Sequence, residues 1–435
     1  MAKVLRVLKT LRNHWKKSTF AFLAISYGVK YVKDRNDTFE LMRSYCEEAA
    51  KYGELPLPIG AKPRHITVIL NPAANRRKAV DLFDKYCAPI FHLAGISVSI
   101  VKTENAGQTK GYMEVIDDTQ AVVLAGGDGT LSEAVTGMLR REDADHVAEI
   151  LPIGILPLGR TNSVAKAFYC RGKNDNSKEA MMKASMAVVK EVVRPVDVMK
   201  INVMEEDGEV IGKPVFSPGR LDWGAFHDAY ARRDKYWFWG SLRSYASYVF
   251  SSYKDITWEC DGELKYVLPC SGCSKCKGIP RGSTENSTSK DSKGKDTRWW
   301  QSFIPRKPKT MPAVDYSAVS NPDCGKWHSK SCSTVDFSVV TRNLGGDSKV
   351  AAPHLEVKTG PQKIGMLDFI SEGWNKENDK ESLPVESFCA SELEIKPSPK
   401  HKEPEQWLYI DKENFDVRPI HIALIPNKVK MFCTS

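Results

Sequence analysis

Hydrophobic and polar positions follow different periods in different parts of the chain, and these periods divide it into three regions. Between residues 59 and 195, short apolar runs that predict buried strands alternate with longer stretches of helical periodicity. The expected strands are Ile66–Leu70, Ile96–Thr103, Ala121–Ala125 and Ile153–Pro157, and the expected helices are Arg76–Ala94, Thr109–Asp117, Thr130–Arg141 and a helical stretch that ends near Val193. Strands separated by helices are typical of βαβ units, so the pattern predicts an α/β domain around a parallel sheet.

The second region, residues 196–435, is predicted to form a largely β domain. Strand-like runs dominate it, including Val196–Val203, Thr334–Val340 and His421–Ile425. A basic insertion at about 268–330 begins with a stretch rich in Lys, Ser, Gly and Pro. Residues 371–404 are also polar and contain proline. We expect both stretches to be excursions from the β domain.

The first region, residues 1–58, predicts a basic amphipathic helix and then a polar helix at 34–52. Apolar residues and cations occupy opposite arcs of the first helix; they are Val4, Val7, Leu8, Leu11 and Trp15 on one arc and Lys3, Arg6, Lys9, Arg12, Lys16 and Lys17 on the other. Such a segment is typical of mitochondrial targeting or of binding to a membrane surface. The alternative is a helix docked on the protein itself.

The net charge of +9 is concentrated in two places, which disfavours a protein that is basic over its whole surface. Residues 1–33 carry +8 without any acidic residue, residues 268–312 carry +7, and the remainder carries −6. Nucleic acid is therefore not an expected partner. No apolar run reaches the roughly 18 residues of a clear membrane span. Eleven cysteines in 435 residues are too few for a disulfide scaffold.

The sharpest chemical signal is the glycine loop, Gly126-Gly127-Asp128-Gly129-Thr130, between a predicted strand and a predicted helix. Glycines let the backbone turn tightly and approach a ligand, and N–H groups at a helix N-terminus favour anions. Asp128 inside such a cradle suits a magnesium ion or a reacting hydroxyl. The alternative is a plain turn followed by a capping box, Thr130 to Glu133.

Two further loops follow strands of the same predicted sheet. Residues 71–75, Asn-Pro-Ala-Ala-Asn, end the first strand, and residues 156–162, Leu-Pro-Leu-Gly-Arg-Thr-Asn, end the fourth. The carboxyl ends of parallel strands meet at one edge, where ligands bind. Each loop alone could be a helix cap, made by Asn75 or Thr161. The chain contains neither a Walker A sequence nor a protein-kinase signature.

These three loops resemble those of the diacylglycerol-kinase-like lipid kinases, which include sphingosine, ceramide and acylglycerol kinases. The resemblance is greatest to the mitochondrial acylglycerol kinases. It rests on residues 13–17, 101–103, 135–137 and 235–237, which read Asn-His-Trp-Lys-Lys, Val-Lys-Thr, Val-Thr-Gly and Lys-Tyr-Trp. It covers about residues 1–250 and the last thirty, and it is poor between them.

The resemblance implies a nucleotide cleft between the α/β domain and a β-sandwich-like domain. It implies ATP-dependent phosphorylation of monoacylglycerol and diacylglycerol to lysophosphatidic and phosphatidic acid, with Mg²⁺ beside Asp128. The residues that would line the nucleotide side are Asn71, Thr103, Gly126, Gly127, Gly129, Thr130, Gly159, Thr161 and Asn162. Arg160 stands where the family has a small residue. Arg243 is expected to reach the transferred phosphate, and a surface cation is the alternative.

Carboxylates of the second region complete the site that the resemblance implies. Asp228 corresponds to an Asp near the acceptor lipid, with a surface acid as the alternative. Asp411-Lys412-Glu413 occupies the place of the family's Asp-Gly-Glu, so Glu413 is expected to accept the hydroxyl proton while Asp128 organises metal or hydroxyl. Lys412 in place of glycine puts the turn geometry in doubt. The triplet at 261–263 spells Asp-Gly-Glu but is expected to be a hairpin turn.

Three other hypotheses remain open. The enzyme could be an NAD kinase or a phosphofructokinase-like protein with the same glycine loop. The resemblance also implies association with the carrier translocase of the inner mitochondrial membrane, so the chain could be a non-catalytic subunit there, at the inner membrane or on its intermembrane-space face. Finally, Cys270, Cys273 and Cys276 have the spacing of zinc ligands, which Cys324, His328 and Cys332 could complete; free or oxidised thiols are the alternative.

Overall fold

The structure is a computed structural model of residues 1–435. It describes residues 15–56, 60, 62–105, 107–170, 177–252, 260–276, 316–344, 352–377, 386–398 and 407–434. The α/β domain contains the parallel strands β1 (His65–Leu70), β2 (Ser97–Lys102), β3 (Val122–Gly126) and β4 (Ile153–Pro157), in the order β2-β1-β3-β4. β1, β3 and β4 are buried, mostly apolar runs, as a sheet covered by helices requires, whereas the edge strand β2 is largely exposed. The predicted parallel α/β domain is confirmed.

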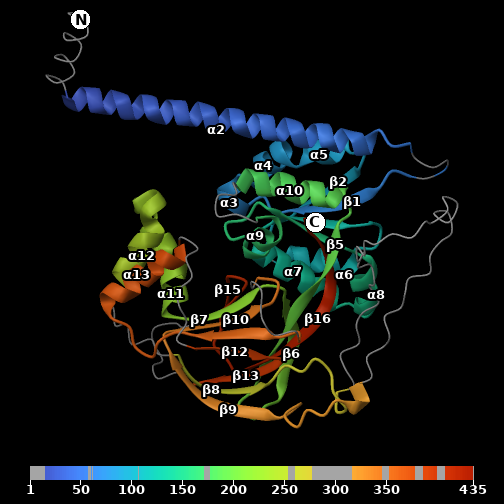
Figure 1. The fold of residues 1–435 in the computed structure, drawn as a ribbon, viewed down its shortest axis with the longest axis vertical. Coiled ribbons are helices and arrows are strands. Elements are labelled where there is room, and N and C mark those ends of the chain that lie inside the picture. The colour runs from blue at the N-terminus through green and yellow to red at the C-terminus, as the bar shows by residue number, and fades with distance from the viewer. Residues whose placement is uncertain are drawn as a thin grey trace, which may run out of the picture.

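Helices cover both faces of this sheet (Figure 1). They are α3 (Ala74–Arg77), α4 (Ala79–Tyr86), α5 (Ala88–Leu93), α6 (Gln108–Val115), α7 (Asp128–Leu139), α8 (Ala144–Ile150), α9 (Ser163–Tyr169) and α10 (Ser177–Val189). The single helix expected over Arg76–Ala94 is wrong, because the chain there forms three short helices. Pro89 lies in the first turn of α5, and Asn75 to Arg77 have positive φ angles of 50–66° that a continuous helix cannot contain.

The β domain consists of antiparallel strands in two facing sheets. One sheet contains β5 (Val193–Met204), β6 (Val210–Ser217), β8 (Cys260–Val267), β9 (Trp327–Thr334), β13 (Glu392–Pro397) and β16 (Ile420–Phe432). The other contains β12 (Glu386–Ala390), β11 (Leu355–Thr359), β10 (Asp336–Thr341), β7 (Arg220–Gly224), β14 (Trp407–Ile410) and β15 (Glu413–Asp416). Apolar side chains from both sheets form one core, for example Ile422 and Phe337, so the domain is sandwich-like.

The two domains share one continuous ten-stranded sheet. β16 pairs antiparallel with β5 and β13, and its end pairs parallel with β4 through Met431 and Ile153. The boundary expected at 195/196 therefore falls inside β5. Three sequence expectations are wrong. Residues 261–263 are part of β8 and not a hairpin turn, the stretch 371–404 contains β12 and β13, and β9 begins within the expected insertion.

Helices of the β-domain half form a separate projection. α11 (Ala225–Ala231), the 3₁₀ segment η1 (Arg232–Leu242), α12 (Arg243–Ser251) and α13 (Met366–Glu377) pack around Phe226, Tyr248 and Phe369. In the view of Figure 1 this projection points toward the N-terminal half of helix α2 (Trp15–Gly53). A short 3₁₀ segment, η3 (Tyr316–Ala318), precedes β9.

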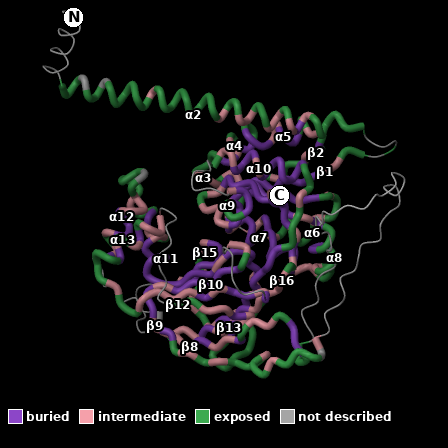
Figure 2. The backbone as a smooth tube through the Cα atoms, viewed as in Figure 1, coloured by how far each residue is buried: buried purple, intermediate pink, exposed green. Residues whose placement is uncertain are grey.

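Helix α2 is one continuous helix of 39 residues, which contains the polar helix expected at 34–52 and begins at Trp15. Its last part packs on α5 and α10, with Ala49 fully buried and a salt bridge of 2.7 Å from Lys190 to Glu48. The remainder leaves the body of the protein and is exposed (Figures 1 and 2). Residues 1–14 of the predicted amphipathic helix lie outside the described residues. Among the described helices, none is both long and apolar enough to cross a membrane.

Candidate functional site

The glycine loop ends β3 and begins α7, as its sequence predicts. Two glycines are required here by close backbone packing. A Cβ on Gly127 would lie 2.7 Å from the Thr161 carbonyl oxygen and 3.2 Å from the Gly159 Cα, and a Cβ on Gly159 would overlap the Gly127 backbone. Gly126 accepts hydrogen bonds from the N–H groups of Leu158 and Gly159 at 3.1 and 2.9 Å. The loops after β3 and β4 thus form one backbone-lined surface at the N-terminus of α7.

Asp128 joins this surface to the next helix. Its Oδ2 accepts the Ser163 N–H at 2.8 Å and its Oδ1 accepts the Val164 N–H at 3.2 Å, so the carboxylate caps the first turn of α9. The Asp128 N–H in turn donates to the Thr161 carbonyl at 3.0 Å. The capping-box alternative for the loop is wrong, because α7 begins at Asp128 and Thr130 lies inside the helix, where its side chain fills the space beside Gly126.

The other predicted nucleotide-side residues lie at the ends of neighbouring strands. Asn71 follows β1 and its Oδ1 accepts the Ala73 N–H at 3.0 Å. Thr103 follows β2, is buried, and its N–H donates to the Leu70 carbonyl at 2.9 Å. Asn162 holds the Gly159 loop, with its amide oxygen 3.0 Å from the Gly159 nitrogen and its amide nitrogen 2.9 Å from the Gly159 oxygen. The carboxyl edge of the sheet therefore collects all four loops.

Glu413 comes from the β domain and lies directly on the glycine loop. A Cβ on Gly129 would overlap its carboxylate. Burial raises the pKa of Glu413 to about 7, and the charge of Glu133 adds to the shift. A carboxylate whose pKa lies near neutrality is suited to accept a proton at physiological pH. The structure thus brings together two groups, Gly129 and Glu413, that are 284 positions apart in the sequence.

Asp411 and Lys412 form a two-residue hairpin turn between β14 and β15. Their φ angles are 48° and 71°, and Ile410 pairs with Glu413, which is the geometry of a type I′ turn. The glycine that the family has at this position is therefore replaced by a lysine that keeps the left-handed conformation. The turn geometry that the sequence put in doubt is intact, and it directs Glu413 toward Gly129.

The Asp411 side chain is buried beside Gly219, and its Oδ1 accepts the Arg220 N–H at 2.9 Å. Its Oδ2 is buried without a hydrogen-bond partner among the described residues. Burial raises the pKa of Asp411 to about 7, and the charge of Asp128 contributes to the rise. Asp128 and Asp411 therefore interact across the domain boundary.

A buried charge network stabilises Lys412 in its strained conformation. Its Nζ donates to Asp222 Oδ2 at 3.1 Å, and Arg220 contacts Asp222 Oδ1 at 2.6 Å. Burial raises the pKa of Asp222, but the charges of Arg220 and Lys412 outweigh it and hold this pKa well below its usual value. Burial also lowers the pKa of His227 to about 4, so this imidazole is neutral near pH 7. Asp222 is therefore an anion that anchors the lysine of the turn.

Sequence reasoning missed this network, although β7 contains a signal for it. Arg220 and Asp222 alternate with Leu221 and Trp223, so the two charges share one face of an otherwise apolar strand. Charged residues are rarely buried unless they are paired. That pattern could have indicated a buried ion pair between Arg220 and Asp222. It could not have indicated that Lys412 also pairs with Asp222.

Arg243 and Arg160 meet at one acid. Arg243 Nη1 lies 3.0 Å and Arg160 Nη1 3.2 Å from the carboxylate of Asp234 in η1. Arg160 adjoins Gly159, so both guanidinium groups lie on the side of the β4 loop.

Asp228 is in α11 and is buried, not a surface acid; its Oδ1 accepts the Tyr409 hydroxyl at 2.8 Å. Burial raises the pKa of Asp228 to about 7.

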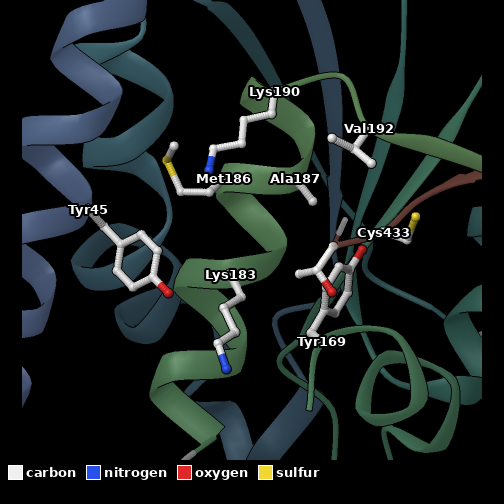
Figure 3. Close-up of a pocket in the computed structure, with 9 residues that line it drawn as sticks. Tyr45, Tyr169, Lys183, Met186, Ala187, Lys190, Val192 and Cys433 are labelled. Carbon is white, nitrogen blue, oxygen red and sulfur yellow. The ribbon is translucent and has the colours of Figure 1, made fainter. Parts of the chain in front are cut away.

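A surface pocket of about 320 Å³ lies elsewhere, beneath α2 (Figure 3). Tyr45 of α2, Lys183 and Met186 of α10, and Cys433 and Thr434 near the end of the chain contribute to its lining. None of the nine lining residues belongs to the glycine loop or to the hairpin at Asp411. The pocket therefore takes no part in the site described above.

Comparison with protein families agrees with this division of the chain. Residues 65–201 match the diacylglycerol kinase catalytic domain, and residues 219–435 match the acylglycerol kinase C-terminal domain. Among solved structures, a protein from Bacillus anthracis described as a putative diacylglycerol kinase covers 87% of this chain and 99% of its own, with a TM-score of 0.50 and 16% identity. This likeness supports the fold.

Whole-length relatives carry the assignment further. The human protein named mitochondrial acylglycerol kinase is 33% identical over 98% of this chain and 96% of its own length. The Xenopus laevis protein of the same name is 31% identical over 100% of this chain and 96% of its own. Mouse ceramide kinase is 33% identical over 28% of this chain and 25% of its own length. The chain therefore belongs to the acylglycerol kinase family of lipid kinases.

Proposed function

We propose that this chain transfers the γ-phosphoryl group of ATP to the hydroxyl of monoacylglycerol and diacylglycerol. The observation that carries the proposal is the contact of Glu413 with Gly129, because it puts a base beside an anion-binding helix terminus. Lipid kinases of this family use ATP. The products would be lysophosphatidic and phosphatidic acid.

The proposed chemistry divides between the two sides of the site. Backbone N–H groups at the start of α7 bind the phosphates, and the side-chain amide of Asn162 holds the Gly159 loop against them. Glu413 accepts the hydroxyl proton as the lipid oxygen attacks the γ-phosphorus. Arg243 and Arg160 are the cations on hand to stabilise the transferred charge, and Asp234 orients both.

The carboxylates at the domain boundary suit the magnesium ion that accompanies ATP. Mg²⁺ prefers carboxylate oxygens, and Asp411 Oδ2 is a buried oxygen without a partner among the described residues. Asp411, with Asp128 beside it, would hold the ion. A bound divalent cation neutralises phosphate charge as the transfer proceeds. Asp128 itself keeps α9 and the Thr161 loop in place through its two backbone hydrogen bonds.

A membrane surface is the proposed source of the lipid. The free part of α2 exposes large apolar side chains: Trp15, Phe20, Phe22, Leu23, Ile25, Tyr27, Val29, Tyr31 and Val32. A second group of exposed apolar side chains lies in η1, where Trp237 is 74% and Phe238 64% exposed. Aromatic residues favour the membrane interface, and the cations of residues 1–33 favour anionic lipids. Asp228, buried in α11 of this projection, is the proposed contact for the acceptor lipid.

The relatives' names and the basic first segment support a mitochondrial location. Within the mitochondrion, the inner membrane or its intermembrane-space face is our proposal. The NAD-kinase alternative loses support, because the whole-length relatives are named acylglycerol kinases. The translocase-subunit hypothesis stays an alternative, and the cellular experiment below tests it.

The direct test is a phosphoryl-transfer assay with the full chain on vesicles. Vesicles would contain monoacylglycerol, diacylglycerol, ceramide or sphingosine, and NAD would be offered in solution, each with γ-labelled ATP and Mg²⁺. We expect label in the two acylglycerols and loss of transfer in the Asp128→Asn variant. Labelling of NAD alone, or of none of these acceptors, would contradict the proposal.

A cellular experiment separates catalysis from scaffolding. In cells that lack the chain, we expect the wild type to rescue the phenotype and the Asp128→Asn variant, at equal abundance, to fail. Full rescue by that variant would favour the translocase subunit. Circular dichroism of the purified variant controls for its folding, because the introduced amide group retains only one oxygen for the two N–H groups of α9.

A further inference from the structure

Four cysteine side chains converge at the end of β8, on the β domain. Cys270, Cys273, Cys276 and Cys324 place their sulfur atoms within 4.8 Å of one another. The first three have the spacing C-x-x-C-x-x-C, and the fourth lies 48 residues farther along. We propose that these four thiolates bind one structural Zn²⁺ ion.

The sulfur positions match a mononuclear tetrahedral site. Four sulfurs at about 2.3 Å from a tetrahedral zinc ion lie about 3.8 Å apart. The structure has Cys273 Sγ to Cys276 Sγ at 3.7 Å and Cys276 Sγ to Cys270 Sγ at 3.8 Å. A disulfide would require about 2.05 Å. A four-iron cluster would bind each thiolate to a different iron and so hold the sulfurs farther apart. Tetrahedral four-thiolate sets bind zinc or iron, and a closed set of four cysteines is a common ligand set of structural zinc sites, so zinc is the ion we propose.

Of the ligands that the sequence suggested, Cys324 completes the set and two others do not. His328 and Cys332 lie on β9, where Tyr266 stacks on the His328 ring at 5.5 Å and Cys332 belongs to the buried core. A set of four cysteines leaves no open coordination position, which is typical of a structural site and not of a catalytic one.

The two segments that carry the ligands are tied to each other by ordinary hydrogen bonds as well. The Ser274 N–H donates to the Val319 carbonyl at 2.8 Å, and the Lys275 ammonium donates to the Pro322 carbonyl at 3.0 Å. The Asn321 amide nitrogen lies 3.4 Å from Cys270 Sγ, a contact of the kind that orients a metal-bound thiolate. The ligand positions are thus supported by groups outside the set.

Local backbone geometry also fits a built site. Gly272 has φ of 129°, a conformation that favours glycine, and a Cβ there would overlap the Tyr316 ring. The turn between the first two ligands is therefore closed against η3. A metal bound here would join the end of β8 to the segment before β9, and so fix both ends of the connection at residues 277–315.

The first test measures metal in the full chain purified under reducing conditions. Elemental analysis should give one zinc per chain, and replacement by Co²⁺ should give the absorption of tetrahedral thiolate coordination. Absence of stoichiometric zinc, iron in place of zinc, or disulfides among the four cysteines in the reduced protein would each overturn the proposal. These measurements use the wild-type protein, so they do not depend on whether a variant folds.

Variants then identify the ligands. Cys273→Ser and Cys324→Ser should each lose the zinc and the cobalt absorption, whereas the matched control Cys46→Ser, in α2, should retain one zinc per chain. A strong chelator should lower the thermal midpoint of the wild type and leave that of Cys273→Ser unchanged. Zinc retained by both ligand variants would contradict the proposal. The proposal stands independently of the kinase reaction, because metal content is measured without lipid or ATP.

Discussion

The glycine loop and the Asp411–Glu413 hairpin face each other across the site, but they are built by different means. The glycine loop is made of backbone groups, and its neighbours are the next loops of the same sheet, as in the contact of Gly127 with Gly159. The hairpin is made of side chains whose ionisation depends on burial and, for Lys412, on Asp222 and Arg220. In the proposed mechanism, one side would bind the phosphates through fixed backbone groups, and the other would accept the proton with a group whose pKa is set by its surroundings.

This difference predicts how each side tolerates change. On the loop, a single methyl group meets rigid backbone, so the cost appears as lost stability and lost ATP binding. On the hairpin, a change of charge can leave the fold intact and remove the chemistry. Substitutions that separate folding from catalysis therefore test the comparison, and the effects below are given from the largest to the smallest.

The largest effect is expected for Glu413→Gln. The amide keeps the packing on Gly129 but cannot accept the lipid proton, so kcat should fall by about 10²–10⁴. KM for ATP should be unchanged, because the phosphates contact the loop. Radiolabel transfer to monoacylglycerol measures kcat, and a thermal melt that matches the wild type controls for folding. Near-normal turnover would remove Glu413 from the mechanism.

Two glycine substitutions should separate a loss of stability from a loss of turnover. Gly159→Ala puts a methyl group against the backbone of Gly127, so we expect about 3 kcal/mol of lost stability and weakened ATP binding. Gly129→Ala meets only the end of the flexible Glu413 side chain, so it should fold normally and lose turnover. Gly28→Ala, with nothing near its Cβ, is the control. Chemical denaturation measures the stability and nucleotide titration measures ATP binding. Equal stability of Gly159→Ala and Gly129→Ala would be evidence against this difference between the two glycines.

Lys412→Met tests the charge network of the hairpin. It removes a charged hydrogen bond to the buried Asp222, so we expect the free energy of unfolding to fall by about 2 kcal/mol. The matched control is Arg43→Met, which removes the exposed pair with Glu47 and should change stability by less than about 0.5 kcal/mol. Urea unfolding measures both. If the two substitutions cost the same, the network does not stabilise the turn.

The sequence predicts the loop side far better than the hairpin side, for a physical reason. Glycines, strand ends and helix starts are local signals, so β1 to β4 and the loops after them follow from short patterns. The capping of α9 by Asp128 does not follow from a local pattern, because the accepting carboxylate follows β3 and the donating Ser163 N–H follows the loop after β4. The pKa of Glu413 depends on burial, which no local pattern records.

Long-range contacts explain the remaining differences. The resemblance to a family identified Glu413, but only the structure shows that Lys412 keeps a left-handed turn by pairing with Asp222, 190 positions away. From the sequence alone, Asp228 could have been a surface acid. It is buried because a residue distant in the sequence, Tyr409, packs over it and donates a hydrogen bond to it. The fourth cysteine of the zinc site was one of three candidates in the sequence, and folding selects Cys324 because it precedes β9 beside the end of β8.

The most direct test of the central claim is the pH dependence of kcat on acylglycerol vesicles. Glu413 must be ionised to accept a proton, and burial raises its pKa to about 7, so activity should be full above this pH. Below it, kcat should fall by at least about tenfold per pH unit. Burial also raises the pKa of Asp411 and of Asp228 to about 7, so the limb should become shallower in Glu413→Gln and not vanish. A wild-type profile that stays flat from pH 8 down to pH 5, or a limb that is equally steep in Glu413→Gln, would contradict the assignment of Glu413 as the base.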